Sequence, residues 1–563
     1  MTRPADYPPP FGTRDAIAAP SDPDDERIDV GVLIVGAGPA GLACAIRLGQ
    51  LLEEHPETAE KLGEVPVAVL EKGKAPGSHL LSGAVVNPRG LRRLFRGRMQ
   101  LADLPLFGEV QSEAVYFLRP RSSVRIPAPP TMRNHGNYVA SLSQLGRWLG
   151  EQAEEAGATI LPETPAARLL VTDGRVRGVR TGDKGRGRNG EQLPNFEPGS
   201  DLVARVTVLA EGTQGHLTGA AIRHFGLEGE NPQVWALGVK EVWRVARPLR
   251  RVIHTMGWPL RSAAKYREFG GSFIYPMGED MVTLGMVVGL DYRDVELSPH
   301  DLLQELKTHP KLRRLLDGGE RVAWGAKTIP EGGLLSVPKR LHAPGLLLCG
   351  DGAGLVNVPA LKGIHYAIES GRLAAEAAFA ALQPGQTPWT PGALAVYDES
   401  LRDSFVWRDL ETVRNMRQAF GRGFWLGAAL AGAMTASRGK FPPTDLRTEP
   451  DSEVELLRSG RARRYPRPDG QLTFDKLSSV YLSGNRTRDD QPNHIRIQRR
   501  VPRELGELWV RMCPAQVYEL GGGDGEVEVG ITPSNCVQCG AISARGGRLT
   551  PPEGGSGPEY TLT

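Results

Sequence analysis

The chain has 563 residues, of which 40% are hydrophobic and 24% charged, and this composition excludes a wholly disordered protein. The formal net charge is only +3, which gives no electrostatic reason to expect nucleic-acid binding. At roughly 150 residues per domain, the length predicts three or four domain-sized pieces.

Five cysteines are too few for a disulfide framework, so we expect a reducing compartment. The N-terminal segment has no apolar core of the kind that a secretory signal carries. No apolar run reaches the roughly 18 residues that a membrane-spanning helix needs. We therefore expect neither secretion nor a transmembrane segment.

Residues 1–29 are polar and rich in Pro and Asp, and predict a flexible lead. From Val30, the run VGVLIVGAGPAGLACAIRLG predicts a strand, a glycine turn and a helix, and VAVLE predicts a second strand. Residues 181–200 predict a surface hairpin or insertion, and residues 230–340 contain several strand-like runs. Another strand and glycine turn follow at 345–355, with helices expected at about 364–382 and 400–436.

The first glycine turn has the spacing of a dinucleotide-binding site. Gly36 permits a tight turn, Gly38 lets the backbone approach a pyrophosphate, and Gly41 lets the helix pack closely on the strand. Glu71 ends the second strand, where an acidic side chain binds a ribose hydroxyl. The combination of strand, turn, helix, strand and acid favours a dinucleotide site over a chance glycine turn.

A second glycine turn, Cys349-Gly350-Asp351-Gly352, again lies between a strand and a helix. A Gly350–Asp351 pair suits FAD, because the carboxylate can accept a hydrogen bond from a ribityl hydroxyl. No second GxGxxG is visible for a nicotinamide cofactor. We therefore expect the flavin to be reduced by something other than bound NAD(P)H. The alternative interpretation of the second glycine turn itself is an ordinary surface turn.

Three of the five cysteines lie near the C-terminus. Cys536 and Cys539 form CxxC, and Cys513 precedes a proline upstream. This spacing favours one shared metal centre. The alternatives are a thioredoxin-like redox pair, a zinc site that would need His494, and three cysteines buried by chance.

Residues 423–436, GFWLGAALAGAMTA, carry no charge and are flanked by Arg422 and Arg438. The run is too short to span a bilayer. A tryptophan and flanking arginines are typical of a helix that lies at the membrane surface. A buried core helix is the equally weighted alternative.

Several long stretches resemble the electron transfer flavoprotein–ubiquinone oxidoreductase family, and the resemblance runs from about residue 29 to the C-terminus. They include HGNYVASLSQLGRWLGEQAEEAG at 135–157, FGGSFIYP at 269–276 and LTFDKLSSVYLSGNRTRDDQPNHI at 472–495. The resemblance implies electron transfer from reduced electron transfer flavoprotein, through FAD and a [4Fe-4S] cluster, to ubiquinone or another membrane quinone. No side chain is assigned an acid–base catalytic role.

The resemblance also implies an α/β fold of mixed α+β type with three kinds of domain. These are a Rossmann-like FAD domain of the glutathione-reductase type, an interleaved quinone-binding sheet domain and a ferredoxin-like cluster domain. The expected boundaries are 30–225 with 340–440, then 226–339, then 441–563. It implies a monotopic protein without nucleic-acid partners, for which we expect the cytoplasmic face of a bacterial inner membrane, with residues 423–436 as the interfacial helix.

The resemblance also implies the site residues, each of which lies at the matching position of the family pattern. They are Gly36, Gly38, Gly41, Glu71, Gly350 and Asp351 for FAD, Gly270 and Gly271 for the quinone headgroup, and Cys513, Cys536 and Cys539 for the cluster.

Two departures from the family pattern stand out. The family continues CxxC to CxxCxxC, whereas this chain has Ile542 at the last position. Three outcomes stay open: a cluster with one iron open to a non-cysteine ligand, a three-iron cluster, or no cluster. Ile364 and Tyr366 replace the usual threonines beside a histidine, which we expect to alter hydrogen bonding near the flavin. The rival functions are an FAD-dependent reductase or hydroxylase of the same fold, for example one resembling geranylgeranyl reductases, and a non-catalytic protein on a relict flavin fold.

Overall fold

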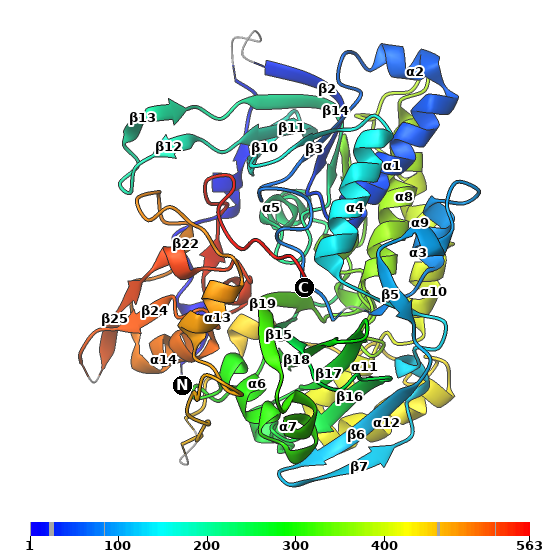
Figure 1. Cartoon of the computed structure of the whole chain (residues 1–563). Helices are drawn as coiled ribbons and strands as arrows, with labels where there is room; N and C mark the ends of the chain where they lie inside the picture. Colours follow the sequence, from blue (N-terminus) through cyan, green and yellow to red (C-terminus); the bar gives the residue numbers. More distant parts are fainter. Residues whose placement is uncertain (1, 22–26, 84, 459–461, 524) are drawn as a thin grey trace.

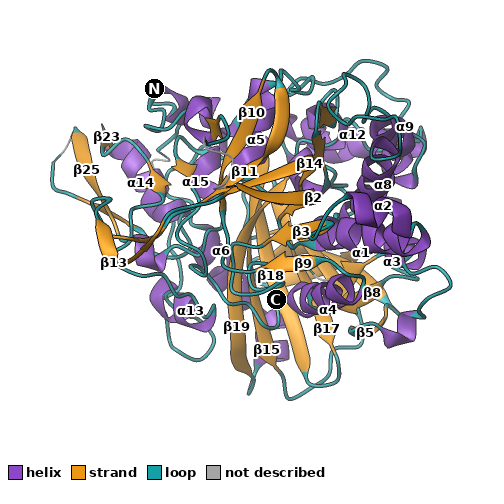
Figure 2. Cartoon of the chain, turned by 90° about the horizontal axis from the view of Figure 1, so that it is seen from above, coloured by secondary structure: helices purple, strands orange, loops and turns teal. Residues whose placement is uncertain are grey.

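The structure of the chain is a computed structural model, which describes all residues except 1, 22–26, 84, 459–461 and 524. Two large sheets form its centre, and the C-terminal elements pack on the second of them (Figure 1). Helices α1 (Pro39–Glu54), α3 (Arg89–Leu94), α4 (Leu142–Glu155) and α8 (Ile364–Ala381) gather on one side of the molecule (Figure 2). Helix α14 (Arg503–Met512) and strands β23 (Arg500–Pro502) and β25 (Glu526–Ile531) lie on the opposite side.

The first sheet has the order β1-β10-β11-β14-β2-β3-β9, with β21 also paired to β14. Strand β2 is buried over its last six residues, and its pairing with β3 and β14 is parallel. A strand buried on both faces reads as a continuous apolar run, which is why VGVLIV predicts it. The bounds are β1 Ile17–Ala18, β2 Arg27–Val35, β3 Val67–Leu70, β9 Thr159–Leu161, β10 Ala166–Thr172, β11 Arg175–Thr181, β14 Asp201–Leu209, β20 His342–Ala343 and β21 Leu346–Leu348.

Helices cover this sheet and join it in one apolar core. Helix α1 packs against α8 and α4, and α8 extends over α3 and α9. The bounds are α1 Pro39–Glu54, α2 Pro56–Lys61, α3 Arg89–Leu94, α4 Leu142–Glu155, α5 His216–His224, α8 Ile364–Ala381 and α9 Val396–Arg402.

The second sheet has the order β19-β15-β18-β17-β16-β6-β7 and is antiparallel except where β16 meets β6. Helix α6 packs on it, and the core between them continues into the C-terminal region. The bounds are β6 Glu113–Arg119, β7 Ser122–Ile126, β15 Trp235–Arg244, β16 Val252–Gly257, β17 Gly270–Met277, β18 Met281–Gly289, β19 Glu320–Pro330, α6 Pro299–Lys307 and α7 Pro310–Leu316.

The C-terminal region is built from short elements. They are α13 Lys476–Leu482, β22 Ile495–Arg496, β23 Arg500–Pro502, α14 Arg503–Met512, β24 Tyr518–Leu520, β25 Glu526–Ile531, α15 Ala541–Ala544 and β26 Arg548–Leu549. The chain then returns between the two sheets, where the Tyr560 hydroxyl accepts from Ala326 N at 3.2 Å and Thr563 O accepts from Ser143 N at 2.9 Å.

The remaining elements are smaller. A three-stranded sheet joins β4 Val85–Val86, β5 Leu106–Glu109 and β8 Tyr138–Ala140, and the hairpin of β12 Lys184–Arg186 with β13 Gln192–Glu197 confirms the prediction for residues 181–200. The predicted helical region at 400–436 is divided into α10 Phe405–Glu411, α11 Met416–Ala419 and α12 Phe424–Ala436. Among the helices of the described part of the chain, none is long and apolar enough to cross a membrane.

The predicted flexible lead is wrong for residues 2–21. Strand β1 pairs with β10, Ala16 is fully buried, and Thr2 O accepts a hydrogen bond from Leu456 N. The first long strand also begins at Arg27 rather than at Val30. The polar composition did not indicate this ordered structure, because a short stretch of backbone hydrogen bonds needs no apolar run.

The expected boundary between residues 30–225 and 226–339 does not follow the sheets. Strands β6 and β7 come from residues 113–126 but complete the second sheet, because β6 pairs with β16. The chain therefore passes between the first and the second sheet more than once.

Candidate functional site

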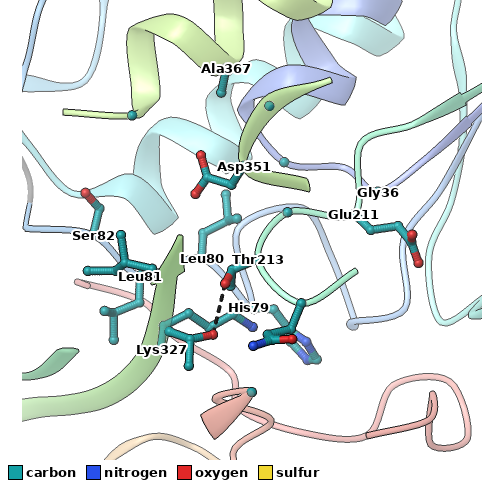
Figure 3. Close-up of a pocket in the computed structure, with 18 of the residues that line it drawn as sticks. Gly36, His79, Leu80, Leu81, Ser82, Glu211, Thr213, Lys327, Asp351 and Ala367 are labelled. Carbon is teal, nitrogen blue, oxygen red and sulfur yellow. Dashed lines mark hydrogen bonds between the residues drawn. The ribbon is translucent and has the colours of Figure 1, made fainter. Parts of the chain in front are cut away.

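A cavity of about 310 Å³ lies where the two sheets meet. The first sheet contributes the ends of its parallel strands and the turns that follow them, and the second sheet contributes inward side chains (Figure 3). In open α/β sheets, ligands bind at the carboxyl ends of the strands. Its lining includes Gly36, Gly38, Glu71, Glu211, Gly350 and Asp351 from the first sheet, and Lys240, Phe273, Tyr275, Val287, Lys327 and Thr328 from the second.

The turn after β2 can be made only by small residues. Gly36 has φ 107°, and a Cβ there would lie 2.5 Å from Ala210 O. A Cβ at Gly41 would lie 2.0 Å from Gly36 O, so its absence lets α1 approach the strand end. Gly38 caps α1 at the cavity, where a Cβ would meet only Leu80 at 3.7 Å. Its missing side chain leaves space at a helix N-terminus, which suits an anionic phosphate.

Glu71 follows β3, and its side chain is buried at the cavity wall. Its carboxylate accepts hydrogen bonds from Gly73 N at 2.6 Å and from Ala37 N at 3.2 Å. Burial raises the pKa of this carboxyl group despite these two bonds. A carboxylate has about four acceptor positions, so hydroxyl groups of a ligand can still bind to it.

Asp351 points into the same cavity from the turn after β21 (Figure 3). Burial raises the pKa of its carboxyl group to about 6. Gly350 has φ 66°, and its N–H donates to Ser370 Oγ at 3.0 Å, which ties the turn to α8. The structure therefore brings together Gly36, Gly38, Glu71, Gly350 and Asp351, with Gly41 supporting the turn from behind.

The predicted quinone glycines lie outside this lining. Gly270 and Gly271 start β17, and their register partners on β18 are Val288 and Val287, of which Val287 lines the cavity. A Cβ at Gly270 would lie 2.0 Å from Val287 O, and one at Gly271 would lie 2.6 Å from Thr255 O. Close strand approach thus explains both glycines, and their contact with a quinone stays a prediction.

Four lysines that the sequence motifs did not indicate line the cavity: Lys72, Lys240, Lys327 and Lys362. Burial lowers the pKa of Lys240 to about 7 and the pKa values of Lys327 and Lys362 to about 8. Lys240 donates to Ser82 O at 2.8 Å. Lys240 lies in β15 and Lys327 in β19, whereas Lys72 follows β3 and Lys362 precedes α8. They were missed because a single lysine in a strand or a loop carries no motif of its own.

Of the two departures beside the histidine, only Ile364 reaches the cavity. Tyr366 turns away from it, and its hydroxyl donates to Asp409 Oδ2 at 3.1 Å. Tyr366 is therefore placed to affect the cavity only indirectly.

The three C-terminal cysteines line a second, smaller cavity. Cys513 follows α14, and Cys536 and Cys539 lie in the loop before α15. Backbone N–H groups of residues 515–517 point at Cys513, that of Gln538 donates to Cys536 Sγ at 3.4 Å, and that of Ala541 points at Cys539. These donors suit thiolates that bind a metal cluster.

Burial raises the pKa of all three thiols, that of Cys539 to about 12. Thiolates in such a place need the positive charge of a metal centre. In the described part of the chain, no three His, Cys, Asp or Glu side chains are grouped so as to hold a single metal ion. The cysteines instead surround a cavity, as cluster ligands do.

The two cavities share a wall. Gly540 and Leu549 line both of them. We call the loop that carries Cys536 and Cys539 the ligand loop. Two residues of the larger cavity bind it: Lys72 Nζ donates to Gln538 Oε1 at 2.7 Å, and Thr328 N donates to Cys539 O at 2.8 Å. Two cofactors in these cavities would be near neighbours.

Two family models match the chain: "ETF-QO, ubiquinone-binding" over residues 235–329 and "Electron transfer flavoprotein-ubiquinone oxidoreductase, 4Fe-4S" over residues 470–561. The mitochondrial electron transfer flavoprotein-ubiquinone oxidoreductase of Dictyostelium discoideum is 40% identical over 566 residues, covering 95% of this chain and 91% of that protein. The probable electron transfer flavoprotein-ubiquinone oxidoreductase of Acinetobacter baylyi is 36% identical over 572 residues, covering 95% and 98%.

Among solved structures, a geranylgeranyl bacteriochlorophyll reductase-like protein from Thermoplasma acidophilum has a TM-score of 0.54. It is 18% identical, covers 75% of this chain and 93% of its own, and shows a shared fold alone. The sequence relatives are far more similar and extend along nearly the whole chain. The resemblance is confirmed: the chain belongs to the electron transfer flavoprotein–ubiquinone oxidoreductase family.

Proposed function

We propose that this enzyme accepts electrons from reduced electron transfer flavoprotein and passes them, through FAD and an iron–sulfur cluster, to ubiquinone or another membrane quinone. The observation that carries the proposal is the shared wall of the two cavities at Gly540 and Leu549. The residues present fit both groups: a glycine turn at a helix N-terminus for a dinucleotide, and three buried cysteines with N–H donors for a cluster. A reductase without a cluster would have no use for the second cavity.

FAD, when bound, supplies a ring that exchanges electrons singly or in pairs. The chain supplies position and electrostatics. In this proposal, Gly36 and Gly38 admit the pyrophosphate, and Glu71 and Asp351 accept ligand hydroxyl groups. Residues 226–339 provide most of the quinone side of the cavity, and residues 441–563 provide the cluster side.

The purified protein tests this function directly. We expect a flavin spectrum, iron and acid-labile sulfide, and reduction of a soluble quinone analogue that depends on reduced electron transfer flavoprotein. Flavin without iron would favour the reductase or hydroxylase alternative. A protein without flavin would contradict the proposal altogether.

Replacing Lys327 tests whether a charge in the larger cavity affects the cluster in the smaller one. Its ammonium group donates to Gln538 O at 3.2 Å, within the ligand loop, and interacts with Cys536 and Cys539. A nearby positive charge stabilises the reduced cluster, so Lys327→Met is expected to lower the cluster potential by about 60 mV, a tenfold change for one electron. A redox titration followed by electron paramagnetic resonance measures it. Lys339→Met, on the exposed surface, is the control and should change nothing.

Gly271→Ala tests the quinone assignment. The added Cβ would lie 2.6 Å from Thr255 O and must displace β17 locally. If β17 carries the quinone contact, quinone reduction falls about tenfold, which corresponds to about 1.4 kcal/mol, while flavin reduction by electron transfer flavoprotein keeps its rate. Stopped-flow measurement of both half-reactions separates them, and equal loss in both would reject the assignment.

Helix α12 is apolar and largely exposed, so the alternative of a buried core helix is wrong. Only Gly427 and Met434 are buried within it, whereas Trp425 is 64% exposed and Leu426 52% exposed. Strands β6 and β7 lie beside α12 (Figure 1). The ring of Phe117 on β6 lies 5.5 Å from that of Trp425 between centroids, and exposed Val124 on β7, the register partner of Phe117, adds to this surface. We call α12 with the β6–β7 hairpin the apolar surface.

Cationic side chains surround the apolar surface. Arg422 and Arg438 flank α12, and Arg119 and Arg121 lie at the tip of the hairpin; all four are exposed. We propose that this surface enters the headgroup region of a membrane and that the protein is monotopic, on the cytoplasmic face of a bacterial inner membrane. Apolar side chains rimmed by arginines suit an anionic lipid surface.

A further inference from the structure

The smaller cavity is lined by three cysteine thiols, whereas a [4Fe-4S] cluster has four irons. A [4Fe-4S] cluster is ordinarily held by four cysteine thiolates, and the matched family model is of the 4Fe-4S type. Of the five cysteines, all of which lie in the described part of the chain, Cys513, Cys536 and Cys539 line this cavity. The other two cysteines are buried in the core of the first sheet and its helices, where Cys349 follows β21 and Cys44 lies in α1. They are not available to the cluster.

No other side chain of the cavity lining is a strong ligand for iron. Apart from the cysteines, the described lining consists of Met512, Ala515, Val517, Tyr518, Val537, Gly540, Ala541, Ile542 and Leu549, which brings no carboxylate and no imidazole. His494 is buried with both ring nitrogens unpartnered, but it lies outside this lining. Tyr518 brings the remaining side-chain oxygen of this described lining, so a variant at that position is part of the test below.

Ile542 takes the position that a fourth thiol would need. It lies three residues after Cys539, as Cys539 lies three after Cys536, and it lines the cavity from α15. The side chain is 4% exposed and is firmly packed, because a Cβ at Gly547 would lie 2.5 Å from its Cγ1. It presents carbon and hydrogen to the cavity.

We propose that three thiolates hold the cluster and that the iron facing Ile542 has no protein ligand and is therefore exchangeable. The inference rests on the iron–sulfur cluster of the proposed function. When a one-electron oxidant such as ferricyanide takes one electron from a [4Fe-4S]²⁺ cluster, the unanchored iron leaves as Fe²⁺ and a [3Fe-4S]⁺ cluster remains. All four sulfides stay, and the three cysteine–iron bonds are kept.

The test compares the holoenzyme with Ile542→Cys. Each protein is purified without oxygen, treated with ferricyanide and EDTA, desalted, and measured for iron, sulfide and flavin. We expect the original chain to lose one iron in four, keep its sulfide and gain the electron paramagnetic resonance signal of an oxidised three-iron cluster. Ile542→Cys should keep all its iron. Equal iron retention in both proteins, or loss of the whole cluster from the original chain, would overturn the inference.

Two further variants separate the added thiol from other effects. Ile542→Ala removes the same bulk without supplying sulfur, and it should lose its iron as the original chain does. Tyr518→Phe should also behave as the original chain; loss of the iron before oxidation would identify Tyr518 as the missing ligand and reject the inference. Flavin content confirms folding in each case, and a protein with flavin but no iron would refute the inference while leaving the FAD site intact.

Discussion

Replacing Gly41 with valine is expected to abolish flavin binding. The first carbon of the new side chain would lie 2.0 Å from Gly36 O and 3.1 Å from Ile34 Cγ2. Backbone cannot yield as a flexible side chain does, so α1 must move away from β2 and take the glycine turn with it. Overpacking costs typically 1–3 kcal/mol, and here the cost falls on the phosphate-binding turn itself. Flavin absorbance after desalting and a thermal melt measure both effects.

Gly38→Ala separates cofactor binding from folding. Its Cβ would meet Leu80 at 3.7 Å, an ordinary contact, so the melting temperature should change little. The added methyl group occupies space where the backbone faces the cavity, so we expect weaker flavin binding with the fold intact. Gly421→Val, with no neighbour within 4 Å, is the neutral control. Full flavin content in Gly41→Val would show that the turn is not the binding site.

The sequence predicted the parts of the site that depend on local order. Gly36, Gly38 and Gly41 lie within one turn and one helix, so their spacing is sufficient to predict how they meet. The cysteines are nearly as local: Cys536 and Cys539 share a loop, and only Cys513 had to be brought in from another element. In both cases, residues close in sequence determine most of the shape of the site.

The parts that were missed depend on contacts between distant segments. Lys240 and Lys327 lie on neighbouring strands of the second sheet, and only the packing of the two sheets turns them toward the cavity. The pairing of β6 with β16, and of β1 with β10, likewise joins residues more than a hundred positions apart. Hydrophobic periodicity reports which face of a strand is buried, and it does not report which strand lies beside it.

Charging the apolar surface is expected to release the protein from membranes. Trp425 and Leu426 are the most exposed side chains of α12 among those with large apolar groups. Burial of such a side chain contributes about 1.5–3 kcal/mol, so replacing both with glutamate should reduce vesicle binding by at least about a hundredfold. Co-sedimentation with vesicles that contain an anionic phospholipid measures the loss. The half-reaction with electron transfer flavoprotein should stay unchanged, because α12 contributes no residue to either cavity.

Leu477→Glu provides the matched control. Leu477 is 48% exposed, almost as much as Leu426, but lies on α13 in the C-terminal region, away from α12 (Figure 1). Its replacement should leave vesicle binding as it is. Added salt should weaken binding of the original chain only in part, because the arginines contribute about 1 kcal/mol each at an anionic surface and are screened, whereas apolar insertion is not. If Leu477→Glu released the protein as fully as the α12 variant, or if salt alone released it, the apolar surface would not be the membrane contact.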